Sequence, residues 1–394
     1  MNYKLLALLF FDFLFLLYGV TTISISAKEA IILYENKDFI HYLVVFSTKL
    51  FGQNDFALRL PFILFHMMGV GLLYRISSYY LKEDVYRLFT IMIFILLPGV
   101  LSSSLIVNNS PITIFFTLLF IFLIEEDENT YAYLLLMFLL FVDNSFEVLF
   151  LGVFAYAVYT KENKLMYLSG SLFLLSLYIY GFDTGGKPKG YFLDTLAMYA
   201  LVFSPLLFLY YFYTMYRILF KGKKGLLWFI SSVAFFLSIL LSFRQRIPLS
   251  DFAPYAVIAL PLIVKNFFSS LNIRFPIYQK PYKISLYLTI AFLVINFLFT
   301  YFNKSLYLVL DDPKMHFARK FHIAKELALQ LKKDGITQIK CKDTRLCKRL
   351  EFYGIDLGDR YLISEENTPK SFKKVTISYK STPIATYSVS KLHN

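Results

Sequence analysis

The chain has 394 residues, of which 57% are apolar and only 17% are charged, and it contains 44 Phe and 31 Tyr. A soluble protein carries about 25% charged residues, so the composition excludes a soluble globular protein and indicates many membrane helices. The net charge of +13 falls mostly in short loops and in the C-terminal segment, where such charge sets topology or contacts lipid headgroups. It does not indicate binding to nucleic acid.

Polar or charged loops separate a series of apolar runs, which predict about eleven transmembrane helices. The runs are 5–25, 60–81, 88–107, 112–124, 131–142, 146–160, 165–182, 191–216, 226–243, 252–264 and 284–302. The first is longer than the core of a signal peptide and has no small-residue cleavage site, so it is interpreted as a membrane helix. The third is expected to bend at Pro98, and the eighth contains Pro205.

The basic loop 217–225 (RILFKGKKG) is the strongest cytoplasmic signal, because Lys and Arg stay on the inner side of a membrane. It places the N-terminus in the cytoplasm, and the protein is expected in the inner or plasma membrane of the cell. The loops 26–61, 108–111, 143–145, 183–190 and 244–251 then lie outside, and an odd number of spans places the C-terminal segment outside as well. We expect two domains, a membrane domain over 1–304 with its first external loop over 26–59, and a small extracytoplasmic domain over 305–394.

The C-terminal segment has the pattern of a small α/β domain. Helices are predicted over 316–333 and 344–353, and strands over 336–341, 375–379 and 385–389. The only cysteines of the chain, Cys341 and Cys347, lie in this segment. An extracytoplasmic location is oxidising, so a disulfide between them is expected.

The segment 26–61 is too charged to cross a membrane, although apolar runs flank it. Apolar residues recur within it at helical spacing, which predicts a helix lying in the membrane interface; they are Phe39, Tyr42, Leu43, Phe46 and Leu50. Carboxylates and an arginine held at a membrane surface suit a reaction on a lipid-borne substrate.

This segment resembles the first external loop of the GT-C glycosyltransferases of the ArnT and protein-O-mannosyltransferase type. In that family an acidic pair opens the loop, and Phe-Gly followed by Arg-Leu-Pro closes it. Here Lys28-Glu29 stands in place of the acidic pair, and the close runs from Phe51-Gly52 to Arg59-Leu60-Pro61. A lysine therefore replaces the first acid of the family.

Two later stretches carry the same resemblance. Asn109-Ser110-Pro111 aligns with a Thr-Asp-Xaa-Pro turn of the family, with an amide where the family has an acid. Asp143 and Glu147 lie in a turn where many relatives have Lys-Gly. The stretch RQRIPLSDFAPYAVIALPLIV, which contains Tyr255, resembles a late external loop and the helix that follows it.

The resemblance implies a GT-C-like bundle that transfers a sugar from a polyprenyl-phosphate donor to a glycan, lipid or protein acceptor on the extracytoplasmic face. Glu29 is the expected general base, because the acceptor must lose a proton as it attacks the anomeric carbon. Cationic side chains are expected to hold the donor phosphate; these are Lys28, Arg59, Arg244 and Arg246. The expected contacts to sugar and acceptor are Asp55, Asn109, Asp143 and Tyr255.

Alternatives stay open. A chain in which Lys28 replaces the family acid is also compatible with a catalytically silent relative that binds lipid-linked glycans. A transporter or flippase is a third interpretation, although its polar residues would be spread through the bilayer midplane. The absence of a P-loop disfavours a nucleotide-driven pump, and no ligand cluster indicates a metal, so a divalent ion remains an open question. Asp12 lies within the first span, where a hydrogen bond to a neighbouring helix is the preferred interpretation.

Overall fold

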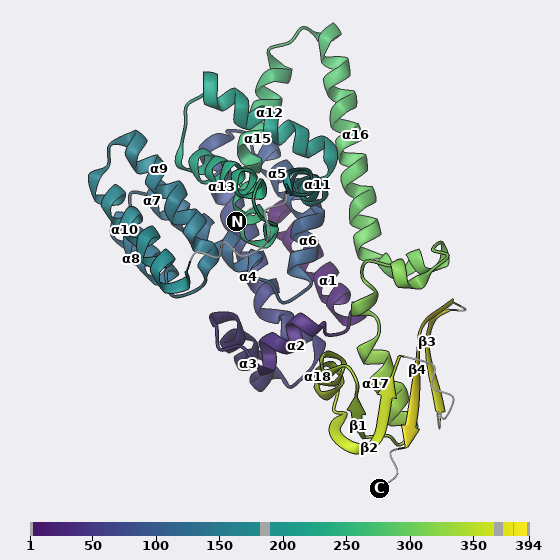
Figure 1. The fold of residues 1–394 in the computed structure, drawn as a ribbon. Coiled ribbons are helices and arrows are strands. Elements are labelled where there is room, and N and C mark those ends of the chain that lie inside the picture. The colour runs from purple at the N-terminus through teal and green to yellow at the C-terminus, as the bar shows by residue number, and fades with distance from the viewer. Residues whose placement is uncertain (1–2, 182–189, 366–372, 381, 392–394) are drawn as a thin grey trace. The chain divides into compact units, whose positions relative to one another are not determined.

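The computed structural model of the chain describes residues 3–181, 190–365, 373–380 and 382–391. These residues are mainly helical and form two compact units (Figure 1). The first, the helical unit, comprises Met1–Phe13, Phe62–Ser104 and Asn108–Phe297. The second, the C-terminal unit, comprises Leu14–Pro61, Leu105–Val107 and Leu298–Asn394. In this division the first loop belongs with the C-terminal segment.

Four helical segments of the described chain are long and apolar enough to cross a membrane, and up to six if each of two bent pairs counts as one span. The four are α1 (Tyr3–Thr22), α4 (Asp55–Tyr80), the segment Ala253–Asn272, and α16 (Pro276–Tyr301). The third of these consists of α14 (Ala253–Val257) and α15 (Leu260–Asn272). These segments coincide with expected spans, but eleven spans are not shown.

The two bent pairs mark the positions of Pro98 and Pro205. Helices α5 (Asp84–Leu96) and α6 (Pro98–Ser104) meet at 63°, which agrees with the expected bend. Helices α11 (Phe192–Phe203) and α12 (Pro205–Lys221) meet at 107°, so the apolar run 191–216 forms two helices at a sharp angle and not one straight helix. Ser204 has a φ of +75° and proline cannot donate the backbone hydrogen bond that would continue the helix.

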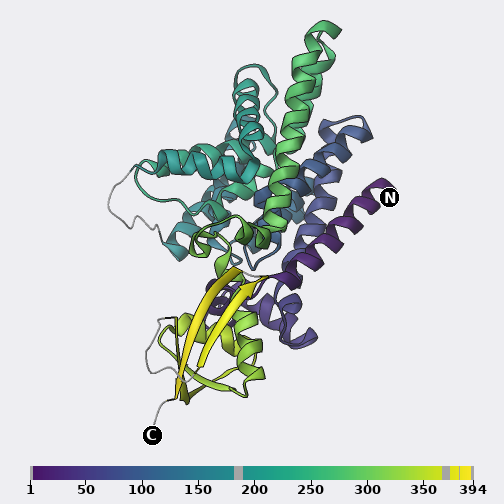
Figure 2. The same cartoon turned by 90° about the vertical axis from the view of Figure 1, so that its right-hand side faces the viewer.

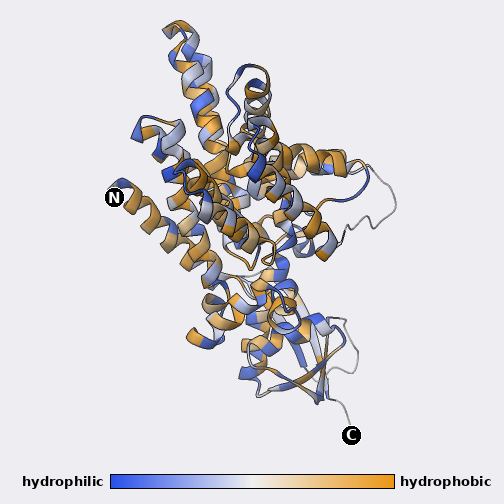
Figure 3. Cartoon of the chain, turned by 90° about the vertical axis from the view of Figure 1, so that its left-hand side faces the viewer, coloured by the Kyte–Doolittle hydropathy of each residue, from blue (hydrophilic) through white to orange (hydrophobic). Residues whose placement is uncertain are grey.

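Five other apolar runs form helices, which range from 11 to 18 residues. They are α7 (Ser110–Glu125), α8 (Asn129–Leu139), α9 (Glu147–Thr160), α10 (Asn163–Tyr180) and α13 (Leu226–Ser242). A straight crossing takes about 20 residues. The helices are coloured mostly as hydrophobic in Figure 3. Their packing is close, since a Cβ at Gly152 of α9 would lie 2.9 Å from Ile230 Cα of α13.

Asp12 makes the contact preferred from the sequence. Its Oδ2 lies 2.8 Å from Nε2 of His66 on α4, and both side chains are buried. The His66 ring stacks on Phe94 at a centroid distance of 5.8 Å. The interpretation of Asp12 as a residue that joins two neighbouring helices is confirmed.

The C-terminal unit contains a four-stranded sheet in the order β1-β2-β4-β3. The strands are β1 (Gln338–Cys341), β2 (Asp356–Ser364), β3 (Lys373–Tyr379) and β4 (Thr382–Lys391). The β1–β2 pair is parallel, and β4 is antiparallel to both β2 and β3. Helices α17 (Ala324–Lys333) and α18 (Thr344–Phe352) contact the strands that Figure 2 shows side by side. The unit also contains α2 (Ala27–Tyr34) and α3 (Phe39–Phe51).

The expected α/β character of this segment is observed, with two differences. Strand β2 was not expected, and the expected helix over 316–333 begins only at Ala324, after a 3₁₀ turn at Arg319–Phe321. The other 3₁₀ turns of the described chain are Asn144–Phe146, Leu249–Asp251, Asn303–Leu308 and Pro313–Met315. The expected outer loop 183–190 lies outside the described residues except for Gly190, and so does Ser381 in the turn expected before 385–389.

The expected disulfide joins Cys341, the last residue of β1, to Cys347 on α18, and their Cα atoms are 5.7 Å apart. The bond ties the helix to the edge of the sheet above a buried apolar core. That core includes Leu327, Ile339 and Leu350, which are fully buried.

Candidate functional site

The first loop, 26–61, forms α2, α3 and the first turns of α4. Helix α2 begins with a capping box. Ser26 Oγ accepts a hydrogen bond from Glu29 N at 3.2 Å, and Glu29 Oε2 accepts one from Ser26 N at 2.7 Å. These bonds satisfy two backbone N–H groups that a helix start leaves unpaired. They also direct the Glu29 carboxylate into the protein, where the residue is only 1% exposed.

Glu29 forms a buried ion pair with Arg59 of α4, which is 0% exposed. Arg59 Nε donates to Oε1 at 2.9 Å and Nη2 donates to Oε2 at 3.0 Å. Val107 N donates to Oε1 at 3.0 Å. Each carboxylate oxygen of Glu29 therefore accepts two hydrogen bonds.

These contacts decide which protonation state Glu29 prefers. Burial by itself raises its pKa, but the Arg59 charge and the hydrogen bonds outweigh burial and hold the pKa of Glu29 below its usual range. A general base needs a pKa near the working pH and an oxygen that can reach the proton. The geometry therefore does not support the expected role of Glu29 as the base.

The other N–H groups of Arg59 bind backbone carbonyls at and beyond the end of α1. Nη1 donates to Ile23 O at 3.0 Å and to Val20 O at 3.4 Å, and Nη2 donates to Ser24 O at 3.1 Å. Carbonyls at a helix C-terminus lack helical partners and favour a cation. All five donors of the guanidinium thus have acceptors, so none remains for a donor phosphate. The geometry gives Arg59 a structural role instead of the expected phosphate contact.

Asp55 completes this cluster, and its side chain is also buried. Its Oδ1 accepts a hydrogen bond from Tyr353 Oη at 2.6 Å, and its Oδ2 pairs with Lys325 Nζ at 2.7 Å. Arg59 Nη1 lies 4.0 Å from Oδ1. We call the five residues Glu29, Asp55, Arg59, Lys325 and Tyr353 the loop clasp, because they join the first loop to the C-terminal segment. Lys28, in contrast, is exposed on α2.

The remaining expected site residues belong to the helical unit. Arg244 and Arg246 are exposed, whereas Asn109 and Asp143 are half-buried and Tyr255 is fully buried. The structure brings the turns that carry the last three together. Helices α7 and α14, which follow two of these turns, contact each other.

Hydrogen bonds join these turns. Ser110 Oγ donates to Ser250 O at 3.3 Å, and Thr113 Oγ1 lies 3.3 Å from Ser145 Oγ. Tyr255 Oη donates to Ser145 O at 2.8 Å. Three loops that lie far apart in the sequence therefore form one polar region.

This region holds three carboxylates. Glu147 interacts electrostatically with both Asp143 and Asp251, and all three side chains are half-buried. Asp143 Oδ1 accepts the Ser145 N–H at 2.9 Å. The sequence analysis did not select Glu147 or Asp251 for the site. The available signal was a carboxylate next to the start of an apolar helix in two of the outer turns. Among the described residues no group of three or more His, Cys, Asp or Glu is arranged to hold a metal ion.

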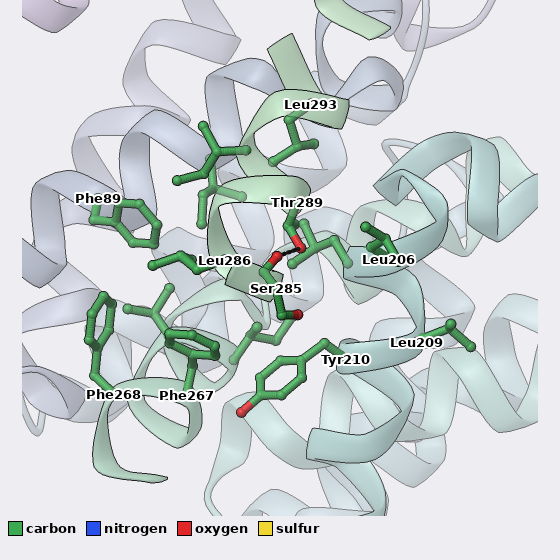
Figure 4. Close-up of a pocket in the computed structure, with 15 residues that line it drawn as sticks. Phe89, Leu206, Leu209, Tyr210, Phe267, Phe268, Ser285, Leu286, Thr289 and Leu293 are labelled. Atoms are coloured by element: carbon green, nitrogen blue, oxygen red, sulfur yellow. Dashed lines mark hydrogen bonds between the residues drawn. The ribbon is translucent and has the colours of Figure 1, made fainter. Parts of the chain in front are cut away.

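The helical unit also contains an apolar cavity of about 280 Å³. Side chains of α5, α12, α15 and α16 line it, and Figure 4 shows Phe89, Leu206, Leu286 and Phe267 around the space. Two hydroxyl side chains, Ser285 and Thr289, are also in its wall, and Thr289 Oγ1 donates to Ser285 O at 2.8 Å. A cavity with such a lining favours hydrocarbon over a sugar.

Comparison with known proteins adds no family to these observations. No model of a known protein family matches the chain, and no curated protein matches it.

Proposed function

We propose that the chain is a GT-C-type membrane glycosyltransferase that moves a sugar from a polyprenyl-phosphate donor to a glycan, lipid or protein acceptor on the extracytoplasmic face. In this reaction an acceptor hydroxyl or amine attacks the anomeric carbon of the sugar. The bond from that carbon to the donor phosphate breaks, and polyprenyl phosphate leaves with the electron pair. The proton of the acceptor passes to a carboxylate of the enzyme.

The observation that carries the proposal is the polar region of the helical unit. Asn109, Asp143 and Tyr255, chosen for their resemblance to glycosyltransferase loops, lie on turns that are joined there by hydrogen bonds. A group of neighbouring carboxylates can supply the general base that the reaction needs. Amide and carboxylate groups are also suitable partners for sugar hydroxyls.

We assign the base to Asp143, since the other two acids of the expected site are already engaged. Glu29 is saturated by Arg59 and backbone N–H groups, and both oxygens of Asp55 have partners. Asp143 uses Oδ1 for the Ser145 N–H. Its Oδ2 has no partner within the described chain and is the oxygen that would take the proton.

The arrangement of the C-terminal unit supports an outer location for the first loop and the C-terminal segment together. Arg349 Nε of α18 donates to Ile25 O at 2.9 Å, and Gln53 Nε2 donates to Phe352 O at 2.9 Å. Segments packed in one unit lie on one side of a membrane. Because α1 crosses before the loop begins, the total number of crossings must be odd. Eleven satisfies this condition if the bent pair α11–α12 crosses and the shorter apolar helices complete the bundle.

The disulfide provides a test of this topology. Cys341 and Cys347 should be oxidised in protein taken from the membrane, because the bond forms outside the cytoplasm. Intact-mass analysis after alkylation without reductant should find no added alkyl group. Replacing both with Ser should lower the free energy of unfolding by about 2–3 kcal/mol, given the short loop they close. Two alkylated thiols in the native protein would contradict the assignment of this segment to the outer face.

Transfer itself should be visible when a strain that lacks the gene is compared with its parent. We expect one cell-envelope glycan or lipid to lose a single sugar, and the wild-type chain supplied in trans to restore it. Purified chain with a polyprenyl-phosphate-sugar should then release polyprenyl phosphate. Unchanged glycans and lipids, together with no release from the donor, would refute the proposal. Saturable donor binding without release would favour a silent relative that binds lipid-linked glycans.

A further inference from the structure

A second cavity of the helical unit, of about 330 Å³, is strongly basic. It lies between the end of α12, the start of α13 and one side of α15. Four cationic side chains line it, Arg217, Lys221, Lys223 and Lys265. No acidic side chain is among the described residues that line it, and the other polar groups are Tyr80, Trp228, Asn266 and Ser269. Glu125 interacts electrostatically with the Tyr80 hydroxyl, which belongs to this wall.

Arg217 is held in place before any ligand binds. Its Nη1 donates to Asn266 Oδ1 at 2.7 Å and to Ser270 Oγ, both on α15. Asn266 Nδ2 in turn donates to Thr214 Oγ1 at 3.1 Å. Both contacts of the guanidinium within the described chain use the same nitrogen. The edge formed by Nε and Nη2 therefore remains for a bidentate contact, the geometry that suits phosphate oxygens.

We propose that this basic cavity binds a phosphate group, with Arg217 as the bidentate ligand and Lys221, Lys223 and Lys265 as the neutralising charges. The cavity opens next to the basic loop 217–225, which we expect on the cytoplasmic side. It is therefore distinct from the polar region assigned to transfer, and the proposal does not depend on glycosyl transfer.

The source of the phosphate is indicated by the apolar cavity on the same helices. Tyr210 lines that cavity, and its hydroxyl interacts electrostatically with Arg217. The seven helical steps from Tyr210 to Arg217 span about 10 Å. The Tyr210 hydroxyl is buried and has no hydrogen-bond partner among the described residues. The apolar cavity (Figure 4) suits the tail of a lipid whose phosphate lies in the basic cavity, whereas free phosphate would use the basic cavity alone.

Binding to the full chain in detergent separates these sources. The probes are dioctanoyl phosphatidic acid, dioctanoyl glycerol, which has the same tails without phosphate, and inorganic phosphate. We expect saturable binding of phosphatidic acid and none of dioctanoyl glycerol. If the ligand is a lipid, Leu286→Trp, which fills the apolar cavity, should weaken the binding of phosphatidic acid. The affinity for inorganic phosphate should stay unchanged. Equal binding of inorganic phosphate and phosphatidic acid, both insensitive to Leu286→Trp, would assign the site to a soluble phosphate.

Variants with a matched control test the site itself. The double variant Lys221→Gln, Lys265→Gln removes two exposed charges of the cavity. It should weaken the binding of phosphatidic acid about 10- to 100-fold. Arg217→Lys keeps the charge but cannot make a bidentate contact, so it should weaken the binding of phosphatidic acid about 10-fold. The melting temperature of this variant is measured to exclude unfolding. Lys224→Gln is the control, because Lys224 lies in the same loop over the rings of Tyr159 and Trp228 and does not line the cavity. Equal affinity of the double variant and the control, or binding of dioctanoyl glycerol as tight as that of phosphatidic acid, would overturn the proposal.

Discussion

Replacing Arg59 with Met should lower the free energy of unfolding by about 3–5 kcal/mol, since it leaves a buried carboxylate without its partner. Glu29 would keep only the N–H groups of Ser26 and Val107. The carbonyls of Val20, Ile23 and Ser24 would lose the Arg59 guanidinium as their donor. Denaturant unfolding of the chain in detergent, followed by helical circular dichroism, measures the loss.

The exposed pair of Arg75 and Glu126 provides the control. Their atoms lie 3.3 Å apart, but the side chains are 61% and 37% exposed, and such pairs contribute less than about 1 kcal/mol. Arg75→Met should therefore have little effect. Combining Glu29→Met with Arg59→Met should cost less than the sum of the two single changes, because neither charge is then left alone. An Arg59→Met variant as stable as Arg75→Met would show that the loop clasp does not hold the C-terminal unit together.

The same pair predicts how stability changes with pH. The folded pKa of Glu29 lies below its unfolded value, so its contribution is complete above the unfolded pKa of about 4.3. It is lost as the pH falls through the lowered folded pKa. The wild-type chain should thus lose stability on acidification below that value, and Glu29→Gln should lose less. A transfer defect in Glu29→Gln should follow the fraction of unfolded protein, which separates the structural role from catalysis.

Features that depend on local sequence were predictable. Apolar runs gave the positions of α1, α4 and α16, and Pro98 gave the bend before α6, because length, composition and proline act within one segment. The disulfide followed from two cysteines in a segment expected outside. The capping box of α2 also has a local pattern, a Ser followed three residues later by a Glu, but the sequence analysis treated that Glu as a reactive group.

Features that depend on long-range contacts were not predictable. Glu29 and Arg59 are 30 residues apart, and no pattern indicates that one neutralises the other. Asp55 reaches Tyr353 across 298 residues, so the union of the first loop with the C-terminal segment appears only in three dimensions. The 107° turn at Pro205 has the same origin, since proline indicates a break but tertiary packing sets its direction. Asp143 stays a prediction; its neighbour Glu147 ends the same turn, whereas Asp251 comes from a turn about 100 residues later in the sequence and is brought near only by the fold.

Asp143→Asn should reduce sugar transfer by about 10²- to 10⁴-fold, the usual effect of removing a positioned general base. The amide keeps an oxygen that can accept the Ser145 N–H, now 2.9 Å from Asp143 Oδ1. Fold and donor binding should therefore persist while the proton acceptor is lost. The measurement is release of polyprenyl phosphate from a polyprenyl-phosphate-sugar by purified chain, beside a binding titration of the same donor.

Asp194→Asn is the matched control, because Asp194 is an exposed acid in the first turn of α11 and belongs to the same unit. It should transfer at the wild-type rate. If Asp143→Asn transfers as fast as Asp194→Asn, the base lies elsewhere. Glu147 and Asp251, the other two carboxylates of the polar region, are then the next residues to replace, since only they share its position at the junction of the outer turns.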